Sequence, residues 1–301
     1  MGAWFPILGR SFSEPIQYID GFAGPGEYEG GEPGSSIIAL EVVRTHRYLL
    51  EFVQAGKRFE FLFVERERLF ANHLRQKLLE TTWPSAFNIE VAQADFESVM
   101  VRLLDEVDAG RRRMPPTLLF IDPFGSAGFT MGVLARLARH SRIDLLINFN
   151  YVDLVRWILP DPVKHTTLDA LYGSERWRSA LRLTGEERKE FLIREYGLAL
   201  HDAGWRNTNF EMINNQNQTQ YYLFFGTGNR SPRGIQVIKQ AMRSGSPDGL
   251  FRYADRSDPD QLRFMGMGMG MGMGMGMGMG MGIRYRNGGP LVSTLLRARS
   301  Y

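Results

Sequence analysis

Short apolar runs alternate with amphipathic stretches along the first half of the chain. Continuous apolar runs that end in turn residues are typical of buried parallel strands, because a parallel sheet is covered on both faces. The stretches between the runs have helical periodicity, and Leu74, Leu78 and Leu79, for example, would share one face of a helix. The pattern predicts strands at 17–22, 60–65, 88–93, 117–122 and 143–149, with helices at 36–54, 66–80, 97–108 and 130–139.

The second half of the chain has a different pattern. A helix predicted at 186–203 is followed by strand candidates at 210–213 and 221–225, which a short polar run joins. So short a connection favours an antiparallel pair, since a parallel pair needs a longer crossover. The predicted fold is α/β: a Rossmann-like, doubly wound, mostly parallel sheet of seven strands with one reversed strand at the end. This is the arrangement of class I methyltransferases.

Acidic residues stand at the ends of the predicted strands. Asp20, Glu65 and Asp122 each end an apolar run, and Asp95 follows another. In doubly wound sheets ligands bind beyond the carboxyl ends of the strands, so we expect these carboxylates along one edge of the sheet.

A glycine-spaced turn follows the first predicted strand, in the sequence DGFAGPG at residues 20–26. Glycine lets backbone N–H groups approach a ligand closely, although a plain strand-to-turn junction is the alternative. Dinucleotide sites begin their helix almost at once after such a turn, whereas here a loop with Glu27, Glu29 and Glu32 intervenes. Three acidic residues oppose a pyrophosphate. The loop therefore favours a cationic ligand such as S-adenosylmethionine over NAD or ATP.

S-adenosylmethionine has a ribose diol, an adenine edge and a charged methionine end, so it needs carboxylates and backbone amides. We expect Asp20 to face the ammonium group, Glu65 the ribose hydroxyls and Asp95 the adenine amino group. Two alternatives stay open: Glu65 as a solvated residue at a helix start, and Asp95 as an N-cap. The predicted cofactor-binding residues are Asp20, Phe22, Gly24, Gly26, Glu65 and Asp95.

The sequence Asp122-Pro123-Phe124-Gly125 is the predicted place of reaction. Methyl transfer needs an aligned acceptor atom and help with its proton. Asp122 and the carbonyl of Pro123 could accept hydrogen bonds from an exocyclic amine, and Phe124 could stack on a flat base. The tetrapeptide is similar to the Asp-Pro-Pro-Tyr loop of amino-group methyltransferases but differs at its third and fourth positions. An ordinary turn is the alternative.

Together these motifs resemble the three-Cys-motif partner family of bacterial and phage-associated proteins. The resemblance covers about residues 4–253 and rests on YIDGFAGPG at 18–26, GGEPGS at 30–35, FLFVE at 61–65, LFIDPFG at 119–125, LLINF at 145–149 and YYLFF at 221–225. It implies a methyltransferase-like fold and a partner protein with a three-cysteine motif of the radical-S-adenosylmethionine type. It assigns neither a reaction nor a substrate.

Composition narrows the classes further. With 301 residues, 44% of them hydrophobic, the chain can form one large α/β domain. It has no cysteine, which excludes disulfides and cysteine nucleophiles and fits a reducing cytoplasm. No apolar run reaches membrane-spanning length, and the histidines lack metal-ligand spacing, so neither membrane contact nor a metal site is predicted.

The net charge of +3 is too small by itself to indicate nucleic acid. The cluster Arg111–Arg113 forms either a solvated turn or a phosphate-contacting patch. Further arginines, among them Arg142, Arg176 and Arg178, are expected around the substrate side. Arginine suits phosphate recognition because its planar fork matches the phosphate oxygens.

The C-terminal segment carries nine Met-Gly units at residues 265–282. Glycine at every second position opposes both strand and helix, so a disordered, low-complexity insertion without function is predicted. The predicted organisation is a methyltransferase-type domain at 1–255, followed by this tract and a basic tail at 256–301.

The sequence as a whole predicts a cytoplasmic S-adenosylmethionine-dependent methyltransferase that acts on nucleic acid. Two alternatives stay open. One is a non-catalytic subunit that uses the same fold to dock the three-Cys-motif protein. The other is a nucleic-acid-binding or nuclease-like accessory factor.

Overall fold

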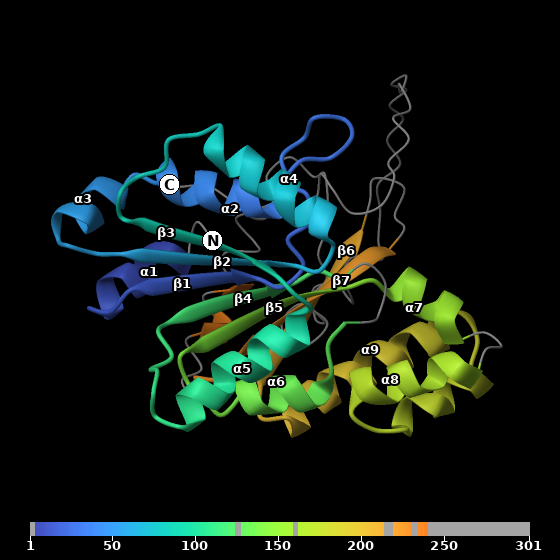
Figure 1. Cartoon of the computed structure of the whole chain (residues 1–301). Coiled ribbons are helices and arrows are strands. Elements are labelled where there is room, and N and C mark those ends of the chain that lie inside the picture. Colours follow the sequence, from blue (N-terminus) through green and yellow to red (C-terminus); the bar gives the residue numbers. More distant parts are fainter. Residues whose placement is uncertain are drawn as a thin grey trace, which may run out of the picture.

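The computed structural model describes residues 4–123, 128–158, 162–213, 219–229, 234–236 and 238–239. Phe124, the Met-Gly tract and the predicted domain boundary after residue 255 lie outside these ranges. In the described part, helices cover both faces of one sheet (Figure 1). No helix in it is long and apolar enough to cross a membrane.

The strands are β1 (Ile16–Asp20), β2 (Phe59–Glu65), β3 (Phe87–Gln93), β4 (Thr117–Ile121), β5 (Ile143–Phe149), β6 (Arg206–Ile213) and β7 (Thr219–Thr227). They form a seven-stranded sheet in the order β3-β2-β1-β4-β5-β7-β6. Strands β1 to β5 are parallel, and β7 is antiparallel to both of its neighbours. The predicted α/β fold with one reversed strand is confirmed. The reversed strand is last in sequence, but it lies between β5 and β6 and not at the edge of the sheet.

The helices are α1 (Trp4–Ser11), α2 (Ser35–Arg44), α3 (Leu49–Gln54), α4 (Arg68–Leu79), α5 (Phe96–Asp108), α6 (Met131–Leu137), α7 (Tyr151–Ile158), α8 (His165–Tyr172) and α9 (Gly185–Asp202). Helices α1 to α4 pack over strand residues such as Tyr18 and Phe120, and α5, α6, α8 and α9 pack over Ile19 and Leu119 on the other face (Figure 1). Since neighbouring strand residues point to opposite faces, β1 and β4 are buried on both, as their continuous apolar runs predict.

The predicted helix 36–54 is divided into α2 and α3. Thr45 ends α2, and its hydroxyl donates to the Glu41 carbonyl at 2.7 Å. The ring of His46 then packs on Phe5 of α1, with 5.2 Å between the centroids, while its Nδ1 accepts the N–H of Tyr48 at 3.2 Å. The break depends on a helix outside the segment, so the periodicity within 36–54 could not predict it.

Helices α7 and α8, with 3₁₀ turns at Pro162–Lys164 and Arg176–Arg182, occupy a region for which the sequence pattern predicts no element. Gly173 ends α8 with a φ of 65°. Buried Trp177 donates its indole N–H to Asp169 at 2.8 Å. Elements this short depend on such tertiary contacts, and they carry little periodic signal in the sequence.

The turn after β1 lies against α4 at Gly26. This residue has a φ of 82°, which is in the left-handed region, and a Cβ there would lie 2.7 Å from a methyl group of buried Leu74. Gly56 has a similar φ of 78°, but a Cβ there would meet no atom within 4 Å. A substitution at Gly56 would thus cost backbone strain alone, whereas one at Gly26 would cost backbone strain and a steric clash with Leu74.

We expect Gly26→Ala to lower the free energy of unfolding by about 2–4 kcal/mol, because left-handed strain and overpacking add. Gly56→Ala, the matched control, should cost about 1 kcal/mol from strain alone. Urea denaturation of both variants measures the difference. Equal losses would mean that Leu74 moves aside and that the turn does not depend on α4.

Candidate functional site

The carboxyl ends of the central strands bring polar side chains together on one face of the sheet. Asp20 ends β1, Asp122 follows β4, and Asn148 lies near the end of β5. The register places Asp122 beside Asn148, whose side-chain amide donates to Asp122 Oδ1 at 2.8 Å. Alternation along the strands puts these side chains, and Tyr221 of β7, on the face that α2 covers.

Glu65 fixes the backbone of two loops. Its Oε2 accepts the N–H of Gly24 at 2.9 Å, and its Oε1 accepts the N–H of Glu67 at 2.7 Å. Glu65 is buried, so its carboxylate oxygens are shielded from water and depend on these two N–H groups as hydrogen-bond partners. The carboxylate therefore ties the turn after β1 to the end of β2. The alternative that Glu65 is a solvated residue at a helix start is wrong.

Asp20 is fully buried and holds the start of α2. Its Oδ1 accepts the N–H of Phe22 at 3.2 Å, and its Oδ2 accepts the hydroxyl of Ser35 at 2.6 Å. Burial raises the pKa of Asp20 to about 6; the charge of Glu65 adds to the rise, and the two hydrogen bonds oppose it.

Gly24 leaves room for a ligand. Its φ is 63°, and a Cβ at this position would meet no atom within 4 Å. The backbone here faces open space, whereas Gly26 packs against α4. The two glycines predicted to bind one cofactor thus have different surroundings, and only Gly24 offers a close approach to the backbone.

Asp122 is the second carboxylate at this edge. Burial raises its pKa to about 7; the charge of Asp20 adds to the rise, and the hydrogen bond from Asn148 opposes it. Among the described residues, no lysine or arginine pairs with Asp20 or Asp122. The pair therefore takes up protons at a higher pH than exposed carboxylates do.

Of the six buried side-chain polar atoms without a hydrogen-bond partner in the described part of the chain, three lie beside these carboxylates: Asn148 Oδ1 and the hydroxyls of Tyr18 and Tyr221. The other three are His140 Nε2, His165 Nε2 and the hydroxyl of Tyr196. The exposed fractions of Asn148, Tyr18 and Tyr221 are 8%, 2% and 5%. The charge of Asp122 contributes to the raised pKa of both tyrosines, as expected for neighbours. Buried polar groups in proteins are normally paired, so unpaired ones beside a site indicate a missing ligand or water.

Residues 26–34 form a closed loop next to this cluster. The N–H of Gly34 donates to the Gly26 carbonyl at 2.7 Å, and the N–H of Tyr28 donates to the Glu32 carbonyl at 2.9 Å. An ion pair between Glu27 and Lys77 anchors the loop to α4. One of the three acidic residues expected to select against a pyrophosphate is thus paired within the protein.

Tyr28 joins this loop to the buried carboxylates. Its side chain is 36% exposed, yet the pKa of its hydroxyl is raised to about 12, by burial first and then by the charges of Asp122 and Asp20. Tyr28 is therefore close enough to the carboxylates to feel their charge, while the residue remains partly accessible.

The other predicted site residues have varied surroundings. Asp95 caps α5, accepting the N–H and the hydroxyl of Ser98 at 2.8 and 2.6 Å, and these bonds lower its pKa. This was the alternative for Asp95, and an adenine contact stays a prediction. Phe22 stacks on Phe96 at 5.5 Å within the core. Pro123 is buried beside Asn148.

Sequence reasoning did not single out Asn148, Tyr221 or Tyr28. Asn148 and Tyr221 lie in the apolar runs LLINF and YYLFF. The only sign in the sequence that they belong to a site is a polar side-chain atom within an apolar strand. That signal becomes specific only when the register brings the side chains next to Asp122. Tyr28 gives no signal at all without the closure of its loop.

The named arginines do not gather at this edge. Arg111–Arg113 and Arg142 precede β4 and β5, so they lie at the amino ends of the strands. Arg142 pairs with Glu14, Arg176 with Asp202 and Arg178 with Asp169, at 2.8, 2.7 and 2.6 Å. No group of three or more histidine, aspartate or glutamate side chains in the described ranges is arranged to hold a metal ion.

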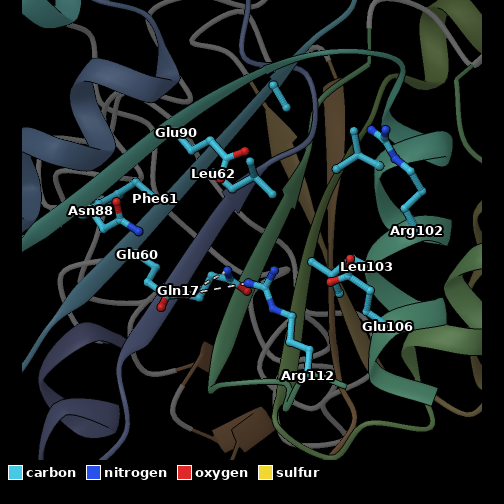
Figure 2. A pocket seen from close by; sticks show the side chains of 12 residues that line it. Gln17, Glu60, Phe61, Leu62, Asn88, Glu90, Arg102, Leu103, Glu106 and Arg112 are labelled. Carbon is cyan, nitrogen blue, oxygen red and sulfur yellow. Dashed lines mark hydrogen bonds and ion pairs between the residues drawn. The ribbon is translucent and has the colours of Figure 1, made fainter. Parts of the chain in front are cut away.

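A separate hollow of about 390 Å³ lies between α5 and the open face of β2 and β3 (Figure 2). Figure 2 shows Arg112, Glu60 and Gln17 joined at one end of it; Gln17 donates to Glu60 at 3.2 Å, and Arg112 lies 4.0 Å from Glu60. No lining residue carries an unpartnered buried polar atom. The hollow therefore lacks the unpartnered buried polar atoms that lie beside Asp20 and Asp122 at the carboxyl ends of the strands.

The strand order and the reversed β7 are those of a Rossmann-like methyltransferase. No protein-family model matches the chain, and no curated protein matches it in sequence. The resemblance to the three-Cys-motif partner family therefore stays a prediction.

Solved structures with similar folds include a Legionella pneumophila protein of family DUF519, with 12% identity, a TM-score of 0.41, and coverage of 84% of this chain and 93% of that one. Trm1 from Pyrococcus horikoshii with S-adenosyl-L-methionine has 14% identity, a TM-score of 0.40, and coverage of 86% and 62%. An O-methyltransferase from Bacillus cereus with SAH has 12% identity, a TM-score of 0.36, and coverage of 75% and 80%. Similarities this low carry no argument about ligand or activity.

The raised pKa of Asp122 predicts a stability that depends on pH. The folded protein holds this proton up to about pH 7, whereas the unfolded chain releases it near 3.8, the ordinary pKa of an aspartate. Between those values the folded state binds more protons, so the stabilising contribution of the protonated group is lost as the pH rises.

Asp122→Asn, which stays neutral, should therefore raise the melting temperature at pH 8 and change it little at pH 4. The full shift corresponds to about 4 kcal/mol as an upper bound. Asp95→Asn is the contrasting control: the pKa of Asp95 is lowered, so this substitution should lower the melting temperature at pH 8 where Asp122→Asn raises it. Equal effects of Asp122→Asn at both pH values would contradict a buried, high-pKa carboxyl.

Proposed function

We propose that this protein is an S-adenosylmethionine-dependent methyltransferase. One observation carries the proposal: Asp20 and Asp122 lie on the two sides of the point where the strand order reverses, between β1 and β4. In open α/β sheets, ligands bind in the crevice at that point, beyond the carboxyl ends of the strands. The polar groups there are carboxylates and an open glycine backbone, which suit a sulfonium ligand with an ammonium group.

The cofactor would lie along the ends of β1 and β2. Gly24 supplies the open backbone, Asp20 the carboxylate toward the ammonium group, and Glu65 the carboxylate toward the ribose hydroxyls. Asp20 and Glu65 already accept two hydrogen bonds each, but a carboxylate has about four acceptor sites and so retains capacity for a ligand. Because Asp20 is fully buried, its contact with the ammonium group would run through a water molecule. Asp95, with Phe96 behind it, would border the adenine.

The acceptor would lie at Asp122. When bound, S-adenosylmethionine supplies a methyl group activated by the sulfonium charge. Asn148 orients the Asp122 carboxylate through Oδ1. The second oxygen, Oδ2, and the carbonyl of Pro123 can then accept hydrogen bonds from an amine. A carboxylate with a pKa of about 7 suits the removal of a proton near neutral pH.

The sequence predicts nucleic acid as the acceptor, whose exocyclic amines could donate to these atoms; the transfer assay below compares it with other amines. Location in the cytoplasm and docking of a three-Cys-motif protein also remain proposals. A docking subunit need not bind S-adenosylmethionine or its product, so calorimetry with S-adenosylhomocysteine separates that alternative from the enzyme.

Glu65→Gln should weaken S-adenosylhomocysteine binding by about 1–3 kcal/mol, because the ribose hydroxyls lose a charged acceptor. Glu67→Gln, an exposed neighbour, serves as the control and should bind like the wild type. Isothermal titration calorimetry measures both. Unchanged affinity in Glu65→Gln, with an intact thermal transition, would remove Glu65 from the site.

Asp122→Asn should lower turnover by about 10²-fold or more while leaving S-adenosylhomocysteine affinity near that of the wild type. The wild-type rate should rise as the pH passes about 7, when Asp122 loses its proton, and the variant should lack this inflection. The groups that face Asp122 are Asp20, Asn148, Tyr18, Tyr28 and Tyr221. The measurement is methyl transfer to DNA, RNA or amine probes.

Loss of S-adenosylhomocysteine binding in Asp122→Asn, without a specific loss of turnover, would make Asp122 part of the pocket wall. An unchanged pH profile would assign the inflection to another group.

A further inference from the structure

The interior of the site offers hydrogen-bond acceptors and aromatic rings, with no cation among the described residues to balance its carboxylates. Asp20 and Asp122 have no lysine or arginine partner there, and Asn148 Oδ1 is an acceptor without a donor. Asn148 is 8% exposed and bonded to Asp122, so its free oxygen is fixed beside that carboxylate. Such a set of groups suits a positively charged hydrogen-bond donor.

The loop at residues 26–34 adds exposed carboxylates outside this interior, and we call this loop the rim of the site. Glu27 is neutralised by Lys77, but Glu29 and Glu32 are exposed at the tip. Tyr28, which precedes them in the loop, is 36% exposed. Carboxylates at the rim attract cations and repel a phosphate backbone, and an accessible phenol ring adds a cation–π surface.

The arginines that the sequence suggested for phosphate contacts do not offset the negative charge of this site. Arg111–Arg113 lie at the other edge of the sheet, and Arg176 and Arg178 are paired with carboxylates on α9 and α8. Lys77, a cation that contacts this loop, is already paired with Glu27 and Glu80.

We propose, building on the methyltransferase function proposed above, that the acceptor is an alkylammonium group, such as a lysine side chain or a polyamine, bound by Asp122, Asn148 and the loop residues Tyr28, Glu29 and Glu32. The ammonium group donates to Asp122 Oδ2 and Asn148 Oδ1. Tyr221, whose buried hydroxyl is unpartnered, completes the wall of this acceptor site.

The reaction balances without a further reagent. The ammonium group gives one proton to the Asp122 carboxylate and becomes a neutral amine with a free lone pair. That lone pair forms the new N–C bond as the C–S bond of the sulfonium breaks, and sulfur keeps the bonding electrons. The products are a methylated ammonium and a neutral thioether, and Asp122 then releases its proton to water.

The test measures transfer of radiolabelled methyl groups to poly-L-lysine, spermine, single-stranded DNA and RNA by the full chain. We expect label in the amine probes and none in the nucleic acids. Poly-L-lysine against spermine separates a side-chain acceptor from a free polyamine. The double variant Glu29→Gln/Glu32→Gln should raise KM for the amine probe about tenfold at unchanged kcat, because the rim loses its attraction.

The matched control is Glu90→Gln/Glu106→Gln, which removes two exposed charges from the hollow in Figure 2 and should leave KM unchanged. Label in DNA or RNA alone, or an equal KM in the two double variants, overturns the alkylammonium proposal. So does an absence of label in the amines when S-adenosylhomocysteine binds. If S-adenosylhomocysteine does not bind at all, the methyltransferase function itself fails, and calorimetry distinguishes that result.

Discussion

Two carboxylates that are withdrawn from water without a neighbouring cation, Asp20 fully and Asp122 partly, set the constraint on which the carboxyl edge depends. Asp20 and Asp122 each lose water, and only hydrogen bonds from Ser35, Phe22 and Asn148 offset that loss. The residual cost appears as raised pKa values of about 6 and about 7. A fold selected only for stability would have replaced such groups, so their position at the reversal of strand order fits a site that a ligand completes.

The sequence could predict the parts that depend on local pattern. Strands β1 to β5 were found because burial on both faces makes their runs continuously apolar, and Asp20, Glu65 and Asp122 could be assigned to one edge because parallel strands end together. The partners of these residues could not be predicted. Glu65 binding the Gly24 N–H and Asn148 binding Asp122 both join segments far apart in the chain, and pattern within one segment contains no information about them.

The loop at residues 26–34 joins these observations. In sequence it is an acidic insertion that argues against a pyrophosphate; in the structure it is a closed hairpin whose base is tied by Gly34 and Gly26 and whose side is tied to Lys77. A Cβ at Gly34 would lie 3.0–3.2 Å from the Gly26 backbone, so any other residue would push the base of the loop apart by a few tenths of an ångström. The geometry of Tyr28 beside the carboxylates therefore depends on two glycines that do not themselves face a ligand.

The position of β3 at the end of the sheet bears on whether strands of other molecules can add to it. This strand ends the sheet, and its outward side chains Asn88 and Glu90 line the hollow in Figure 2. Arg75 of α4 donates to the Val91 carbonyl of β3 at 2.9 Å, so a charged side chain from a helix already occupies part of the backbone of this strand. An edge strand that carries a charge on its open face resists such addition. The exposed carboxylate of Glu90 and the guanidinium of Arg75 thus make this end of the sheet a poor template for a further strand.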